Sequence, residues 1–299
     1  MIIQFPDLVG QEKKTLFIIG NGFDLYHNIP STYEHFKCWL YSNGQEEFVC
    51  QMQKFFPYLK NNGEYLLWTD FEHVLGEYNQ IDLSRLISEN YDRELDDDVQ
   101  NLAIIKFQPI IKQIRPLMKI WAKSIDISKA KPSLQLSKES KYITFNYTKT
   151  LEDIYEIPSS QICHIHGCVD GKEELVVGHN HSKDEDNEID DYFMLEKVRT
   201  DIIKTMNDMV KDCNIQERLH YNFFNSLKDI SHVVILGHSL SDIDSPYFFK
   251  IMKSIACESN WHFSKHDVSG EKSIDNFLEK KESFFSYHNI KINRWIFNF

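Results

Sequence analysis

The sequence predicts an α/β protein built on a doubly wound parallel sheet of the Rossmann-like kind, with a helical insertion subdomain. Short apolar runs without polar alternation, such as Leu16 to Ile19 and Val233 to Leu236, are typical of strands buried on both faces of a parallel sheet. Segments with helical periodicity separate these runs, which favours a parallel sheet with helical crossovers. Several of the runs end directly in glycine or polar residues.

The first strand is expected over residues 15–20, followed by a glycine-containing loop. A helix should begin near Ser31, because Ser31 and Glu34 stand at capping-box spacing. A helical pattern then extends from about residue 46 to 128, and Pro109 and Pro116 are expected to kink or divide it. The acidic run from Asp96 to Asp98 is interpreted as the solvent-exposed start of a helix, where negative charge is favourable.

Strands return at residues 142–145 and 162–165, and a further short strand is expected at 175–177. Six acids in eight residues, Asp184 to Asp191, indicate a charged surface loop rather than a cation site. The remaining elements are a helical stretch over 192–227, a strand at 232–237, a helix at 245–256, a strand at 261–263, a helix near 273–282 and a strand at 291–296.

The whole chain, 1–299, is predicted to form a single domain, with a helical insertion at about 45–140 and a second helical segment at about 190–228. The sequence shows no apolar stretch long enough to span a membrane and no signal peptide, and its six cysteines are scattered. We therefore expect a cytoplasmic protein with no membrane partner. The net charge of −12 argues against nucleic acid as a partner, because gripping its backbone needs clustered Lys and Arg.

Polar residues follow four of the predicted strands at the point where each ends. In an open parallel sheet, ligands bind at the carboxyl ends of the strands, so these residues are expected to share one site. They lie in Gly20 to Asp24, at Asn146, at His166 and in Gly237 to Asp244.

Each of these residues has a functional and a structural interpretation. Gly20 and Gly22 let a backbone approach a phosphate closely, or simply form a turn. Asn146 either holds a hydroxyl or a water, or caps a helix from Thr148. His166 is either a base or a buried histidine satisfied by hydrogen bonds.

A metal site is a further alternative. His164, His166, His179 and His181 could supply imidazole ligands. Gly178 to His181 looks like the last metal motif of the calcineurin-like phosphoesterases, but their early Asp-x-His and Gly-Asp-x-x-Asp motifs are missing. No metal is therefore expected.

Five blocks of the sequence, in this order and spacing, resemble the AbiH family, which is named for bacteriophage abortive infection. AbiH proteins are in turn similar to sirtuins and to sirtuin-like defence NADases. The blocks are LFIIGNGFDLYHNIPSTYEHF from Leu16, WTDFE from Trp68, TFNYTKTLEDIY from Thr144, HIHG from His164 and LGHSLSDIDSPYF from Leu236.

The resemblance implies that the sheet is sirtuin-like, and it implies a site. Asn146 stands in the Thr-Gln-Asn-Ile-Asp block of sirtuins and His166 in their His-Gly block, so both are implied to be catalytic, with NAD as substrate or ligand. Thr148 replaces the sirtuin Asp, and the zinc-binding cysteine pairs of deacylating sirtuins are absent, so protein deacylation is not expected. The residues implied to bind the nucleotide are Gly20, Asn21, Gly22, Phe23, Asp24, Gly237, His238, Ser239, Asp242 and Asp244.

The sequence thus predicts an anti-phage defence protein that cleaves the nicotinamide–ribose bond of NAD or a related nucleotide. One alternative is a non-catalytic module that senses a nucleotide or a phage-derived trigger, and another is a metal-dependent nuclease or phosphatase. The expected partner is a small nucleotide. The identity of the trigger, self-association into a homo-oligomer and the role of the helical insertion stay open.

Overall fold

The computed structural model describes residues 8–57, 63–78, 106–180, 193–256, 258–264, 272–280 and 291–295. The acidic runs at 96–98 and 184–191 lie outside these residues. The chain divides into two compact units, which we call the sheet unit and the helical unit. The sheet unit comprises Met1–Ser31, Ala122–Leu175 and Asp212–Phe299, and the helical unit comprises Thr32–Trp121 and Val176–Lys211.

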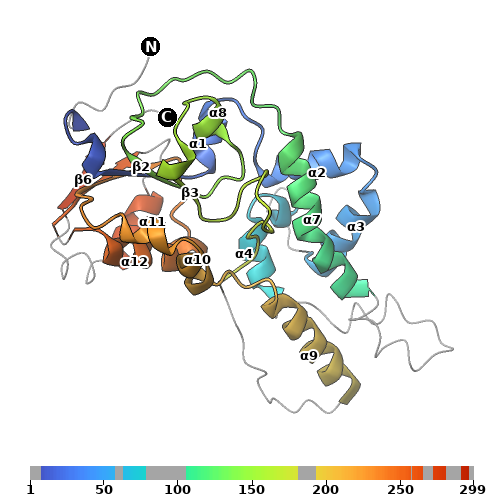
Figure 1. The fold of residues 1–299 in the computed structure, drawn as a ribbon. Helices are drawn as coiled ribbons and strands as arrows, with labels where there is room; N and C mark the ends of the chain where they lie inside the picture. The colour runs from blue at the N-terminus through green and yellow to red at the C-terminus, as the bar shows by residue number, and fades with distance from the viewer. Residues whose placement is uncertain are drawn as a thin grey trace. The chain divides into compact units, whose positions relative to one another are not determined.

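The sheet unit contains a six-stranded sheet, drawn in Figure 1, in the order β3-β2-β1-β4-β5-β6. All of its pairings are parallel, which confirms the predicted α/β class and parallel sheet. The strands are β1 (Thr15–Ile19), β2 (Lys141–Thr144), β3 (Ile162–His164), β4 (His232–Leu236), β5 (Asn260–Ser264) and β6 (Lys291–Trp295).

Helices cover both faces of this sheet (Figure 1), with α10, α11 and α12 on one face and α1 and α8 on the other. Residues 272–280 are also helical. The labelled helices are α1 (Asn21–Tyr26), α8 (Thr150–Asp153), α10 (Cys213–Leu219), α11 (Tyr221–Asn225) and α12 (Ser245–Ser254), and the short 3-10 helices are η2 (Glu12–Lys14), η6 (Ser159–Gln161) and η7 (Asp242–Asp244).

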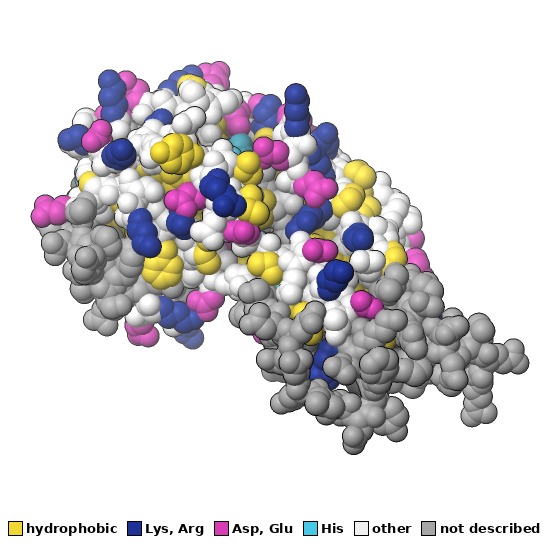
Figure 2. Space-filling model, turned by 60° about the horizontal axis from the view of Figure 1, so that its bottom comes forward, with side chains coloured by type: hydrophobic (Ala, Val, Ile, Leu, Met, Phe, Trp, Pro, Cys, Tyr) yellow, Lys and Arg dark blue, Asp and Glu magenta, His cyan; other side chains and the backbone are white. Residues whose placement is uncertain are grey.

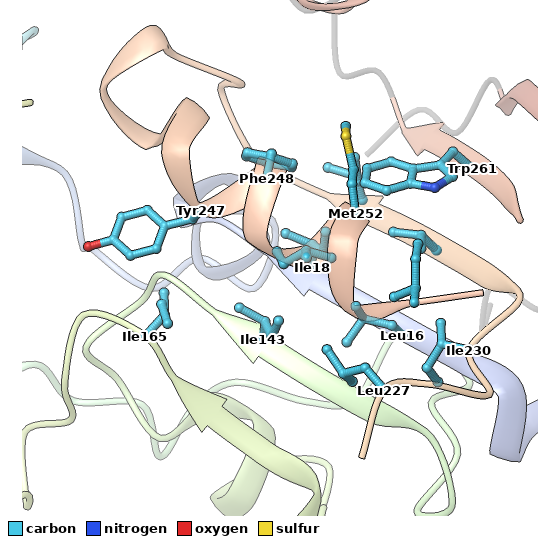
Figure 3. Packing of buried hydrophobic residues seen from close by; sticks show 14 of the residues in the cluster. Leu16, Ile18, Ile143, Ile165, Leu227, Ile230, Tyr247, Phe248, Met252 and Trp261 are labelled. Carbon is cyan, nitrogen blue, oxygen red and sulfur yellow. The ribbon is translucent and has the colours of Figure 1, made fainter. Parts of the chain in front are cut away.

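Strand β1 is buried along its whole length because alternate side chains enter two cores. Leu16 and Ile18 pack with Phe248 and Trp261 on the α12 side, as Figure 3 shows. Phe17 and Ile19 point to the opposite face of the sheet, where they pack in a second core with Tyr142 and Leu236. Burying one such side chain stabilises the fold by about 1.5–3 kcal/mol, so the continuous apolar run fixes β1 in the centre of the sheet.

The strand predicted at 175–177 is wrong. Leu175 and Val177 are buried, which explains their apolar character, but residues 175–177 are not part of a strand. The nearest pairing is an isolated bridge between His179 and Val210. Burial alone therefore produced the strand-like pattern.

The helical unit contains most of the remaining helices. They are α2 (Tyr33–Ser42), α3 (Glu46–Phe55), η3 (Leu66–Trp68), α4 (Phe71–Gly76), α7 (Gln108–Ser124) and α9 (Phe193–Asn207). Aromatic side chains form its core, since Phe36 lies against both Trp68 and Trp121. A buried ion pair joins Lys211 Nζ to Glu72 Oε2 at 2.7 Å.

Two local predictions in this unit need correction. Helix α2 is capped by Thr32, not Ser31, because the Thr32 hydroxyl accepts from the His35 amide while His35 Nδ1 accepts from the Thr32 amide. Helix α7 continues through Pro109 and Pro116, so neither proline divides it, and a kink at either one stays a prediction.

Charged side chains of both signs are interspersed over the face of the molecule shown in Figure 2. Among the described helices, none is long and apolar enough to cross a membrane.

Candidate functional site

The carboxyl ends of four neighbouring strands bring the predicted site residues to one edge of the sheet. Because β3, β2, β1 and β4 are adjacent and parallel, the segments that follow them lie next to one another. The residues predicted to be catalytic or to bind the nucleotide all belong to the sheet unit. They are residues 20–24, Asn146, His166, 237–239, Asp242 and Asp244.

The segment after β1 is a helix rather than the predicted loop. Helix α1 begins at Asn21, directly after Gly20. The glycines allow this segment to pack against the segment after β4. The Gly20 amide donates to the Leu236 carbonyl at 3.0 Å, and the Gly22 amide donates to the Gly237 carbonyl at 2.8 Å.

Side chains larger than hydrogen do not fit at this contact. A Cβ on Gly20 would lie 2.5 Å from the Cα of His238, and a Cβ on Gly22 would lie 2.8 Å from the Cα of Gly237. Gly237 also has a φ of +64°, and a Cβ there would lie 2.2 Å from the amide nitrogen of Phe23. The chain's own backbone therefore accounts for these glycines, and their contact with a nucleotide stays a prediction.

Phe23 and Asp24 are fully buried beneath this contact. Asp24 Oδ2 accepts from the Thr148 hydroxyl at 2.6 Å, and Oδ1 accepts from the Thr150 hydroxyl at 2.8 Å. Burial raises the pKa of Asp24, although these hydrogen bonds oppose the shift. In this structure Asp24 therefore holds α1 against the segment after β2.

Asn146 connects the ends of three strands. Its side-chain amide donates to the Gly20 carbonyl at 3.1 Å, and its main-chain carbonyl accepts from His164 Nδ1 at 3.2 Å. The next helix, α8, starts at Thr150 without a side-chain cap. The helix-capping role considered for Asn146 is therefore wrong. Its side-chain amide instead joins the segment after β2 to the segment after β1.

His166 and His238 flank one carboxylate. Asp244 Oδ1 lies 3.6 Å from His166 Nε2, and Asp244 Oδ2 lies 3.6 Å from His238 Nε2. The ring of Phe145 has its centroid 4.9 Å from that of His166 and 4.4 Å from that of His238, and it meets both edge-on. The Tyr247 ring of α12 also meets His166 edge-on, with its centroid 5.3 Å from that of His166 and 5.7 Å from that of Phe145.

The tautomer of His238 follows from its neighbours. Its Nδ1 accepts from the Leu240 amide at 2.9 Å, so the proton of the neutral ring is on Nε2, directed at Asp244. Leu240 has a φ of +58°, a conformation that costs a bulky residue strain energy. The segment after β4 is therefore held in a specific shape around Asp244.

Two of the predicted nucleotide-binding residues in the segment after β4 lie at the surface. Ser239 is exposed, and Asp242 forms an ion pair with Lys280 of the helical residues 272–280. Asn21 is likewise exposed and accepts from the Ser31 hydroxyl. Asn146 and His166, by contrast, are buried, with exposed fractions of 7% and 4%.

His164 and His166 do not act on a common face. Strand β3 ends at His164, and Gly167, with a φ of +83°, turns the chain. His164 Nε2 donates to Glu152 Oε1 of α8 at 2.9 Å, whereas His166 lies against α12. The two-residue spacing predicted a shared face only for a strand that continued.

Sequence reasoning missed the side chains of Glu152, Phe145 and Cys168. Glu152 Oε1 accepts a hydrogen bond from His164 Nε2, and Cys168 is close enough to His164 to raise its pKa. The Cys168 contact had a sequence signal, because a thiol four residues after a histidine lies across a glycine turn. Glu152 and Phe145 gave no such signal, since their partners come from other strands.

Three of the four histidines considered as metal ligands lie among the described residues, with His164 and His166 in the sheet unit. His179 belongs to the helical unit, where its Nε2 donates to the Met206 carbonyl at 3.0 Å, and His181 lies outside the described residues. Within the described part of the chain, no group of three or more His, Cys, Asp or Glu side chains is placed to hold a metal ion.

Comparison with known proteins gives one match. A family model described as "Bacteriophage abortive infection AbiH" matches residues 16–265, which include every residue of the candidate site. No curated protein and no solved structure matches the chain.

Proposed function

The chain belongs to the AbiH family of bacteriophage abortive infection proteins, and we propose that it serves this anti-phage role by cleaving the nicotinamide–ribose bond of NAD or a related nucleotide. Family membership supports the defence role. The chemistry of the site supports the reaction.

The observation that carries the proposal is the group formed by Asn146, His166, His238 and Asp244 at the carboxyl edge of the sheet. A carboxylate beside one imidazole nitrogen orients the ring and stabilises its protonated form, which is the arrangement a general base needs. The strand order β3-β2-β1-β4-β5-β6 adds support, because dinucleotide-binding folds use the same order and bind their ligand at this edge.

In the proposed reaction, the nicotinamide–ribose bond breaks through an oxocarbenium-like state. His166, with Nε2 facing Asp244, takes a proton on Nδ1 from a ribose hydroxyl or a water. Asn146 holds the ribose or that water with its amide. The His166–Asp244 distance of 3.6 Å is longer than a hydrogen bond, and such contacts often tighten only when substrate is bound.

The nucleotide would contact the two glycine-bearing segments. Asn21 and Ser239 are exposed and Gly22 is half-exposed, and these residues would contact the pyrophosphate. Asp242 offers an exposed carboxylate for the adenosine side. Asp244, predicted for the same side, is instead proposed to orient His166.

A nicotinamide-release assay tests this proposal. Purified protein is mixed with NAD, and His166→Ala and Asn146→Ala are assayed beside it. His73→Ala, which alters an exposed histidine of α4, serves as the matched control. Loss of the general base should slow release by roughly 100- to 10,000-fold, while the control should keep the wild-type rate. Wild-type turnover by His166→Ala would refute the assignment.

A second candidate function is a non-catalytic module that senses a nucleotide or a phage-derived trigger. The burial of Asn146 and His166 favours it, because a closed site suits retention of a ligand. Extraction and chromatography of nucleotides from the same protein sample discriminates the two. Intact bound NAD without nicotinamide release would support the sensing function.

A further inference from the structure

A second group of reactive side chains surrounds His164. It consists of His164 at the end of β3, Glu152 of α8 and Cys168 in the turn that follows β3. The proposed nucleotide reaction makes no use of Glu152 or Cys168. The group lies wholly within the sheet unit.

Both nitrogens of the His164 ring face hydrogen-bond acceptors. Nε2 lies 2.9 Å from Glu152 Oε1, and Nδ1 lies 3.2 Å from the main-chain carbonyl oxygen of Asn146. A carbonyl oxygen and an ionised carboxylate only accept, so an imidazole that satisfies both must donate from both nitrogens. The geometry therefore favours the positively charged imidazolium.

Cys168 is placed beside this cation by a fixed turn. The Gly167 amide donates to the His164 carbonyl at 3.0 Å, and the Val169 amide donates to the Tyr147 carbonyl at 3.0 Å. The His164 ring and the backbone of Asp170 both act on the Cys168 side chain, and each favours its thiolate. A cationic imidazole and a backbone N–H both stabilise a thiolate.

The protonation equilibria agree with this geometry. Burial alone would lower the pKa of His164, but the hydrogen bonds and charges of Cys168 and Glu152 raise it to about 10. Partial burial and the negative charge of Glu152 would raise the pKa of Cys168, but His164 and the Asp170 backbone outweigh them and hold that pKa below its ordinary value. At neutral pH the proton therefore resides on the imidazole.

The other titratable groups near the pair do not reverse this balance. His220, which precedes α11, has its pKa lowered by burial and by the charge of His164, although Glu173 opposes the shift. Lys149 is engaged with Asp153 and Asp170 at 3.6 Å and 3.3 Å.

We propose that Cys168 is a reactive thiolate, held by the His164 imidazolium and positioned through Glu152, and that it takes low-molecular-weight disulfides. The thiolate attacks one sulfur of the disulfide. A new S–S bond forms on Cys168 as the S–S bond of the reagent breaks, and the second half leaves as a thiolate that takes a proton from solvent. The product is a mixed disulfide, which a free thiol reverses by the same exchange.

The other described cysteines provide internal comparisons. Cys38 and Cys50 are exposed, Cys213 is half-buried like Cys168, and Cys163 is buried. Burial raises the pKa of Cys213 and of Cys163. Exposure alone would thus make Cys38 and Cys50 react first, whereas the proposal makes Cys168 react first.

The magnitude follows from thiol ionisation. At pH 6 an ordinary thiol is only about 0.3% ionised, so a thiol that is already ionised gains up to roughly 300-fold in reactive form. Its lower intrinsic nucleophilicity removes part of that gain, which leaves an advantage of roughly tenfold.

The test treats the full chain with glutathione disulfide at pH 6 and follows each cysteine by peptide mass spectrometry. Cys168 should be modified about tenfold faster than Cys38 and Cys50, and the rates should converge as pH approaches 9. Glu152→Gln should reduce the advantage of Cys168 at pH 6 and leave the rate at Cys213 unchanged, which also shows that the variant is folded.

A rate at Cys168 no higher than at Cys38 and Cys50 would overturn the proposal. So would an advantage that Glu152→Gln leaves intact across the pH range. If that variant fails to fold, the wild-type rates and their pH profile decide the question by themselves. The readout is independent of nicotinamide release, so the inference stands or falls separately from the proposed function.

Discussion

Replacing Gly237 by alanine should strongly destabilise the protein, because two costs combine at this position. Its φ of +64° costs an L-residue about 1–2 kcal/mol. The new Cβ would also lie 2.2 Å from the Phe23 amide nitrogen and 2.6 Å from the Gly22 carbonyl carbon. These are backbone atoms that cannot rotate away, and such overpacking costs about 1–3 kcal/mol. The expected loss is therefore about 2–5 kcal/mol.

Two matched variants separate these costs. Gly10 has a φ of +79° but no atom within 4 Å of its Cβ position, so Gly10→Ala carries only the conformational cost. Gly20 has a φ of −114°, yet its Cβ would lie 2.5 Å from the His238 Cα, so Gly20→Ala carries only the clash. Gly237→Ala should exceed both.

Urea unfolding followed by far-ultraviolet circular dichroism measures the free energy of unfolding of each variant. The reasoning is refuted if Gly20→Ala and Gly237→Ala unfold no more easily than Gly10→Ala. The result also bears on function, because lost nicotinamide release in a glycine variant must first be corrected for the folded fraction before it is ascribed to phosphate binding.

Three further predictions concern single side chains, each measured by urea unfolding. Burial raises the pKa of Asp24, so folding favours its protonated form. The wild-type protein should therefore gain stability relative to Asp24→Asn as the pH falls through that raised pKa toward about 4. A stability difference that does not change with pH would contradict this prediction. Thr32→Ala should cost about 1 kcal/mol by removing the α2 cap, whereas Ser31→Ala should cost less. Glu72→Gln should cost about 3–5 kcal/mol by removing the carboxylate that faces buried Lys211, and Lys211→Met in the same chain should recover part of the loss.

Much of the sheet could be predicted from sequence because its signals are local. The apolar runs around Phe17 and Val234 identified β1 and β4 closely, since strands buried on both faces leave no room for polar residues. The wrong predictions about secondary structure also arose from short stretches of sequence. The pattern around Leu175 and Val177 reflects burial without strand pairing, and the cap of α2 falls one residue later because Thr32, rather than Ser31, pairs with His35.

The sequence by itself determined which segments are buried strands and which polar residues follow them, because both depend on neighbouring residues. Only the tertiary structure decided which of these residues meet. The Asn146 amide reaches a carbonyl 126 residues away at Gly20, and Asp244 lies between two histidines from different strand ends. Strand order sets these encounters, and strand order follows from the packing of both cores, which no local pattern encodes.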